Sequence, residues 1–113
     1  MEWIRAVTEE TFHQHVERCE LPVLVHFSAP WCGPCRVVTP SLEAIARAYA
    51  GRVRVVSVNT DRARALMARY QVQNIPTIMV LLEGAVVESA VGVRPQEEYE
   101  RQLQRALELQ DPA

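Results

Sequence analysis

The feature that most constrains this chain is the string Trp31-Cys32-Gly33-Pro34-Cys35, which lies between two segments of different periodicity. An apolar, β-favouring run over residues 23–27 leads into the string, and a helical pattern over residues 36–49 follows it. Free N–H groups and the positive dipole end at a helix start favour a thiolate over a thiol. We therefore expect Cys32 to be a nucleophile and Cys35, one turn on, to resolve the mixed disulfide that it forms.

Other roles for these cysteines are less favoured by the residues. Zinc needs about four ligands, and the chain has no second C-x-x-C; His13 and His15 point to different sides of a predicted helix. A purely structural bridge over so small a loop would restrict little chain entropy. An iron–sulfur cluster shared between two chains is a poor fit to three cysteines, because Cys19 falls on an apolar stripe and reads as a small buried hydrophobe.

Length and composition predict a single domain over residues 1–113. The chain has 113 residues, 49% of them hydrophobic, and a net charge of -2, which gives no electrostatic case for binding nucleic acid or a membrane surface. We expect a cytoplasmic protein, because no basic n-region opens the chain and no run approaches about 18 apolar residues. An odd number of cysteines that includes a C-x-x-C suggests redox chemistry in a reducing compartment.

Apolar periodicity predicts nine elements in the order strand, helix, strand, helix, strand, helix, strand, strand, helix. The predicted strands cover residues 3–7, 21–28, 53–59, 78–82 and 85–91. The predicted helices cover residues 8–19, 36–49, 60–70 (capped by Thr60 or Asp61) and 95–109, with a tail over residues 111–113. Strands joined through helices should be parallel, and the turn at Glu83-Gly84 should make the last two strands antiparallel. The pattern therefore predicts an α/β fold with a mixed sheet and helices on both faces.

The five-residue string at a strand-to-helix junction resembles the active site of the thioredoxin family, and the similarity covers about residues 7–107. The resemblance implies the thioredoxin fold, a central mixed five-stranded sheet flanked by four helices. It also implies a protein-disulfide reductase in cellular electron transport: Cys32 attacks a target disulfide, and Cys35 then releases the reduced target. Such a protein needs no metal or tight cofactor. By resemblance, it acts on disulfide-containing proteins and is recharged by a thioredoxin reductase that draws on NADPH. We expect a monomer, because nothing in the sequence suggests an obligate oligomer.

The resemblance also implies a substrate-binding surface. In the family, the proline before the last hairpin follows a cis peptide bond, so Ile75-Pro76-Thr77 predicts a cis bond between Ile75 and Pro76. The backbone of Ile75 is then free to pair with an extended substrate segment. An apolar patch of this kind suits a protein that grips extended segments without reading much sequence. Its members here are Trp31, Gly33, Pro34, Ile75, Pro76, Val91, Gly92 and Val93.

Three positions depart from the family pattern. His26 stands where the family usually carries a buried aspartate beneath the second cysteine, Ser57 aligns with its lysine, and Ser28 replaces a common tryptophan. Burial lowers the pKa of a histidine and leaves a neutral base. We hypothesise that His26 replaces the aspartate as acceptor of the Cys35 proton, held by Ser57; the alternative is a core histidine satisfied by a hydroxyl or a backbone group.

Two alternatives for the function remain open. The protein could be a thiol oxidant or isomerase, in which the disulfide form is less favoured. It could also be a non-catalytic binding module that uses the apolar patch to hold a partner and keeps its thiols idle.

Overall fold

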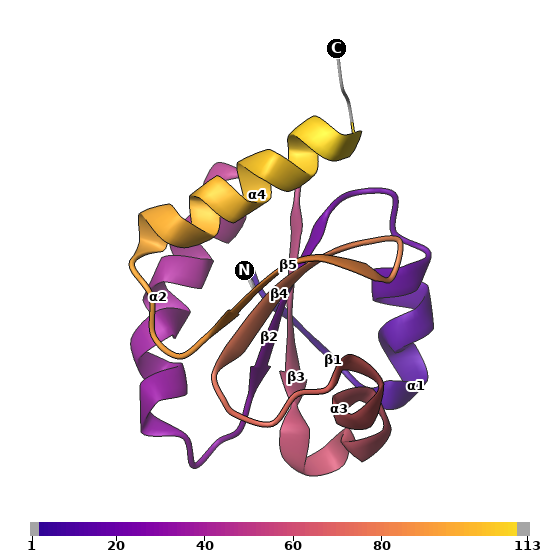
Figure 1. Ribbon diagram of the computed structural model, residues 1–113, viewed down its shortest axis with the longest axis vertical. Coiled ribbons are helices and arrows are strands. Elements are labelled where there is room, and N and C mark those ends of the chain that lie inside the picture. The colour runs from indigo at the N-terminus through magenta and orange to yellow at the C-terminus, as the bar shows by residue number, and fades with distance from the viewer. Residues whose placement is uncertain (1–2, 111–113) are drawn as a thin grey trace.

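The computed structural model describes residues 3–110, which form one five-stranded sheet with helices on both faces (Figure 1). The strands are β1 (Arg5–Val7), β2 (Val23–Ser28), β3 (Arg54–Asn59), β4 (Thr77–Leu82) and β5 (Ala85–Val91). The helices are α1 (Glu9–Phe12), which a π-helical turn extends over His13–Glu17, α2 (Gly33–Ala48), α3 (Arg64–Tyr70) and α4 (Gln96–Gln110). The predicted α/β fold with a mixed sheet and four helices is confirmed; the predicted tail lies outside the described residues.

The strand order is β1-β3-β2-β4-β5, and one strand direction differs from the prediction. β1 and β2 run parallel to β3, whereas β4 runs antiparallel to β2 although α3 connects β3 to β4. α3 has seven residues and spans about 10 Å, roughly half the length of a six-residue strand. The chain therefore leaves β3 at Asn59 and enters β4 at Thr77 beside the same end of β2, opposite Ser28 and Phe27. The chain re-enters the sheet at the end where β3 stopped, so the expectation of parallel strands was wrong here.

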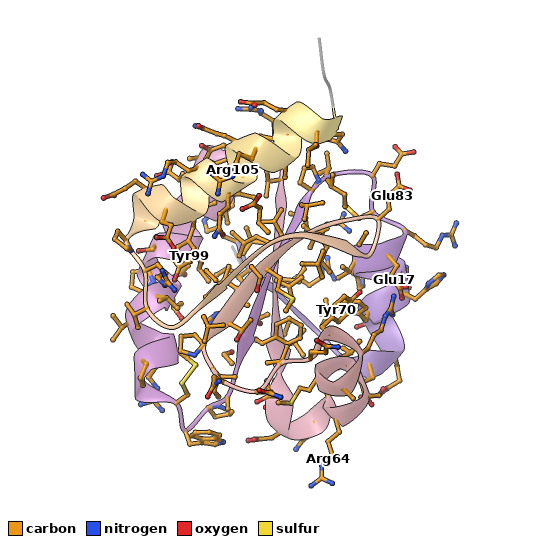
Figure 2. The ribbon with its side chains drawn as sticks, viewed as in Figure 1. Glu17, Arg64, Tyr70, Glu83, Tyr99 and Arg105 are labelled. Atoms are coloured by element: carbon orange, nitrogen blue, oxygen red, sulfur yellow. A yellow bond between two sulfur atoms is a disulfide. The ribbon has the colours of Figure 1, made fainter. Side chains whose placement is uncertain are left out.

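The β4–β5 hairpin is antiparallel, as predicted, and its turn lies at Glu83-Gly84. Both residues have positive φ angles, 49° and 86°, which are typical of a tight hairpin turn that follows the twist of the strands. The Tyr70 hydroxyl donates a hydrogen bond to the Gly84 carbonyl at 2.9 Å (Figure 2). This contact ties α3 to the turn of the hairpin.

Two helix starts differ from the prediction for local reasons. α2 begins at Gly33 because Cys32 caps it. The side chain of Asn59, rather than Thr60 or Asp61, accepts the N–H of Asp61 at 3.0 Å and starts a 3-10 turn over Thr60–Arg62. α3 follows that turn and has no capping side chain of its own. Glu9, which is distant in the sequence, caps α3 instead, because its carboxylate accepts the N–H of Ala65 at 2.7 Å.

The core has two apolar layers, one on each face of the sheet. Phe12, Val16 and Cys19 pack with α3 on one face, and the predicted stripes of α2 and α4 pack on the other (Figure 1). The prediction that Cys19 is a buried hydrophobe is confirmed, because it is 7% exposed. Side chains alternate along a strand. Leu24 therefore joins the α2 layer while Val25 and Phe27 join the other, and this alternation turns His26 toward α2.

Candidate active site

Cys32 and Cys35 form a disulfide at the first turn of α2, with 5.3 Å between their Cα atoms. Cys32 is the N-cap of the helix, and its Sγ accepts the backbone N–H of Cys35 at 3.2 Å. A sulfur in this position receives both a free helix N–H and the positive end of the helix dipole. Both effects stabilise a thiolate on Cys32 once the disulfide is open.

Trp31 precedes the disulfide and is the most exposed large apolar side chain among the described residues, at 68%. Its indole Nε1 donates to both carboxylate oxygens of Asp61, at 3.0 and 3.1 Å. Asp61 belongs to the 3-10 turn before α3, so this contact joins the active-site loop to a segment thirty residues away. Gly33 and Pro34 follow in the exposed first turn of α2.

The peptide bond between Ile75 and Pro76 is cis, as predicted. The Ile75 side chain packs against a small buried cluster made by Cys32, Cys35 and Ala29. Within residues 3–110, no hydrogen bond uses the N–H or C=O of Ile75. The loop that carries the cis bond therefore lies against the disulfide and presents free backbone groups beside it.

The segment after β5 is joined to this loop. Val91 pairs with Thr77 across the β4–β5 hairpin, and the N–H of Gly92 donates to the Pro76 carbonyl at 2.9 Å. Val91 and Val93 are each 48% exposed. Thr77 itself is buried, and its hydroxyl donates to the carbonyl of Asn74.

The Tyr99 side chain, fully buried, braces the same segment from α4 (Figure 2). Its hydroxyl accepts the N–H of Arg94 at 3.0 Å and donates to the Gly92 carbonyl at 3.4 Å. Sequence reasoning identified Tyr99 only as a core residue. The helical spacing that predicts its burial carries no signal for the two backbone groups that its hydroxyl contacts.

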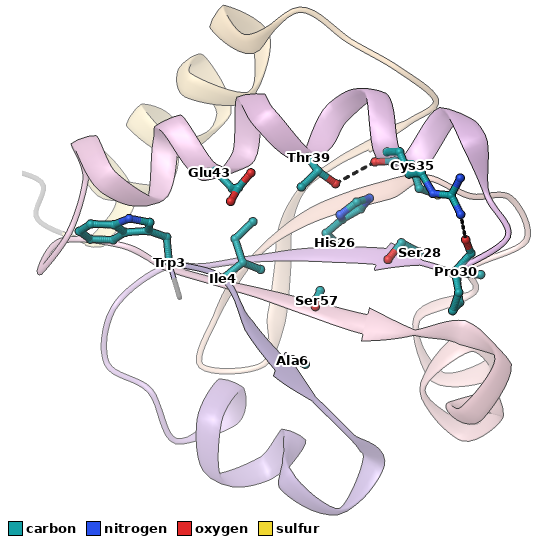
Figure 3. Close-up of a pocket in the computed structure, with 12 residues that line it drawn as sticks. Trp3, Ile4, Ala6, His26, Ser28, Pro30, Cys35, Thr39, Glu43 and Ser57 are labelled. Atoms are coloured by element: carbon teal, nitrogen blue, oxygen red, sulfur yellow. Dashed lines mark hydrogen bonds between the residues drawn. The ribbon is translucent and has the colours of Figure 1, made fainter. Parts of the chain in front are cut away.

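His26 lies on β2 beneath α2 and is 3% exposed. Burial lowers its pKa from 6.5 to about 4, so the imidazole is neutral near pH 7. Nε2 has no hydrogen-bond partner within the described residues, and none joins His26 to Ser57, its neighbour on β3. The predicted support from Ser57 was therefore wrong. The imidazole extends away from the sheet toward Thr39 and Cys35 of α2, whereas the short side chain of Ser57 stays close to the sheet (Figure 3).

A cavity of about 440 Å³ lies between α2 and strands β1 to β3, next to the disulfide (Figure 3). His26 points into this region from β2, toward Thr39 and Cys35 of α2 (Figure 3). The short side chains of Ser28 and Ser57 form part of its lining. The remaining lining residues are Trp3, Ile4, Ala6, Ala29, Pro30, Arg36 and Glu43.

Two further findings bear on the type of site. Within residues 3–110, no three His, Cys, Asp or Glu side chains come together in a way that could hold a metal ion. The helices of the same region include none that is both long and apolar enough to cross a bilayer.

The chain resembles known proteins over most of its length. The family model described as Thioredoxin matches residues 3–105. "Thioredoxin 1" of Synechococcus elongatus is 43% identical over 102 residues, covering 90% of this chain and 95% of the relative. "Thioredoxin" of Porphyra purpurea is 41% identical over 104 residues (92% and 97%), and "Thioredoxin" of Streptomyces clavuligerus is 46% identical over 92 residues (81% and 85%).

Proposed function

Since the chain belongs to the thioredoxin family and is a thioredoxin-like protein-disulfide oxidoreductase, we propose that Cys32 is its nucleophile and Cys35 its resolving thiol. One observation carries this assignment. The Cys32 sulfur caps α2 and accepts the Cys35 N–H at 3.2 Å, which favours negative charge on Cys32.

The proposed reaction is a dithiol–disulfide exchange. The Cys32 thiolate attacks one sulfur of the target disulfide, and the other target sulfur leaves as a thiolate. Cys35 then attacks the Cys32 sulfur, which releases the second target sulfur and forms the Cys32–Cys35 disulfide. Two electrons pass from the protein to the target, and the disulfide form described above is the product of that transfer.

His26 is proposed as acceptor of the Cys35 proton. Three observations support this role: it lines the same cavity as Cys35, burial keeps its imidazole neutral, and its Nε2 is unpartnered within the described residues. A neutral imidazole offers a lone pair to the thiol, and the cavity gives the proton a route to solvent. We expect His26→Ala to change the rate and pH dependence of mixed-disulfide resolution; an unchanged profile would remove His26 from the mechanism.

The substrate is proposed to bind as an extended segment beside Ile75. The free N–H and C=O of Ile75 can pair with a substrate strand, as in strand addition to a sheet edge. Exposed side chains of Trp31, Val91 and Val93 supply apolar contacts. Gly33, Pro34, Pro76, Thr77 and Gly92 complete the proposed site, the buried Thr77 by shaping the loop rather than by touching substrate.

The cellular setting is proposed from the family. Disulfide-containing proteins are the targets, and a thioredoxin reductase that draws on NADPH recharges the pair without a bound cofactor. We propose a cytoplasmic monomer whose residues 1–113 form one domain.

Reduction of insulin disulfides, driven by dithiothreitol and followed by precipitation of the insulin chains, tests the proposal without any reductase. We expect the wild-type protein and Cys19→Ser to accelerate the reaction, and Cys32→Ser to abolish the acceleration. In a separate incubation without dithiothreitol, reduced Cys35→Ser should accumulate a mixed disulfide with insulin on Cys32. Activity retained by Cys32→Ser would overturn the assignment.

A further inference from the structure

The connection between β5 and α4 carries part of the proposed substrate site, although residues 92–95 belong to neither a strand nor a helix. Val93 lies in this connection and is 48% exposed. Gly92, just before it, has a φ angle of 87°, which ends the extended path of β5. The position of Val93 therefore depends on contacts from other segments rather than on the hydrogen bonds of a strand or helix.

Hydrogen bonds on both sides of Val93 supply these contacts. The Tyr99 hydroxyl accepts the N–H of Arg94 at 3.0 Å and donates to the carbonyl of Gly92 at 3.4 Å. The N–H of Gly92 in turn donates to the carbonyl of Pro76 at 2.9 Å. One hydroxyl thus holds the backbone immediately before and after Val93, and Gly92 links that backbone to the loop that carries the cis bond.

Tyr99 is itself held firmly in the first turn of α4 (Figure 2). Its side chain is 0% exposed and belongs, with Leu42 and Leu103, to the apolar layer on the α2 face of the sheet. The ring accounts for this burial, and a phenylalanine ring would fill the same space. Only the hydroxyl reaches the backbone of Gly92 and Arg94, so the hydroxyl is the group that ties the connection to α4.

A connection that is already ordered favours the binding of an extended substrate. Ordering a loop on binding takes away part of the interaction free energy, and a preorganised loop avoids that loss. The benefit reaches only a substrate that extends as far as Val93. The apolar cluster around Cys32 and Cys35 includes Ile75 but not Val93, so a small disulfide at Cys32 gains nothing from the fixed connection.

We propose that Tyr99 is a positioning residue for substrate binding. Its hydroxyl fixes the backbone on both sides of Val93, so that this side chain is ready to contact an extended target segment. The inference rests on the proposed substrate site, and it assigns to this one hydroxyl a share of the preference for polypeptide disulfides over small ones.

Two probes that differ only in chain length test this role. One is a short extended peptide whose central cysteine, flanked by valines, is disulfide-bonded to nitrothiobenzoate, and the other is N-acetylcysteine amide bonded to the same group. In a Cys35→Ser background, the Cys32 thiolate attacks the cysteine sulfur of the probe and expels nitrothiobenzoate, whose low thiol pKa makes it the leaving group. The reaction stops at the mixed disulfide. The ratio of the two second-order rate constants, peptide over single residue, measures what the chain contributes.

The matched control for Tyr99→Phe is Tyr70→Phe, which also removes a hydroxyl that donates to a backbone carbonyl, that of Gly84 in the hairpin turn. We expect Tyr99→Phe to lower the ratio about fivefold, equivalent to about 1 kcal/mol. Most of the loss should appear in the half-saturating peptide concentration rather than in the maximal rate. Tyr70→Phe should keep the wild-type ratio, and an equal ratio in the two variants would contradict the inference.

A Val93→Ser background separates positioning from a general loss of stability. This change removes the apolar contact through which Tyr99 acts, so Tyr99→Phe should lower the ratio much less here than beside an intact Val93. An undiminished effect would mean that Tyr99 acts elsewhere and would end the inference. A wild-type ratio near one would remove the proposed substrate site together with this inference, whereas a higher wild-type ratio that Tyr99→Phe leaves unchanged would remove the inference alone.

Discussion

The buried imidazole of His26 makes the stability of this protein depend on pH, and replacing it should remove that dependence. In the folded protein, burial lowers the pKa of His26 from 6.5 to about 4. In the unfolded chain the side chain is solvated and returns to its ordinary value. Between these two pH values the unfolded state binds more protons than the folded state, so the free energy of unfolding falls as the pH is lowered.

The size of the effect follows from the two pKa values. Well above pH 6.5, protonation of His26 does not affect the free energy of unfolding. Below about pH 4 the loss of stability that it causes is complete. The gap between the two values corresponds to about 3 kcal/mol at 1.36 kcal/mol per unit, and about 2–3 kcal/mol of it is reached at pH 4.5. His26→Gln keeps a polar side chain at the site but cannot take up the proton.

Urea unfolding of the oxidised wild-type protein and of His26→Gln at pH 7.5 and pH 4.5 measures this quantity. All other ionisable side chains are the same in both proteins, so their contributions cancel in the difference. The wild-type protein should lose about 2–3 kcal/mol more than His26→Gln on acidification. An equal loss in the wild type and His26→Gln would refute the reasoning.

Three further predictions concern stability. Leu42→Ala, at a fully buried position of α2, should lower the free energy of unfolding in urea by about 2–5 kcal/mol. Tyr99→Phe should lower the free energy of unfolding by about 1 kcal/mol and speed hydrogen exchange of the Arg94 amide, because this amide donates to the Tyr99 hydroxyl in the wild type. An unchanged exchange rate would contradict the support that Tyr99 gives to this segment. Gly84→Ala should lower the stability by about 1–2 kcal/mol, measured by thermal unfolding, because φ is +86° and a Cβ would lie 3.2 Å from Cγ of Glu17.

Much of the fold follows from local pattern. Continuous apolar runs identify β2 and β4 because both faces of the sheet are covered, and the stripes of α2 and α4 follow from helical spacing. The direction of β4 does not follow, because it depends on where α3 starts. Asn59 begins a 3-10 turn that shortens α3 to seven residues, and the acidic and hydroxyl residues after it look like ordinary caps.

Some features of the candidate site were likewise predictable from the sequence, and others were not. The redox cysteines and the cis bond before Pro76 were predicted because short motifs carry them. The hydrogen bond from Trp31 to Asp61 was not, because it joins residues thirty positions apart that share no spacing rule. The isolated Nε2 of His26 also required the structure, since only tertiary packing decides which hydroxyl lies within reach.

The most direct test of the central claim is the reduction potential of the Cys32–Cys35 couple, measured by equilibration against dithiol buffers of known potential. For a two-electron couple, about 30 mV corresponds to roughly 1.4 kcal/mol, so modest differences are decisive. A protein-disulfide reductase should have a potential at or below roughly −220 mV, within or below the range of the cytosolic glutathione pool. A higher potential would contradict the account and identify the protein as an oxidant or isomerase.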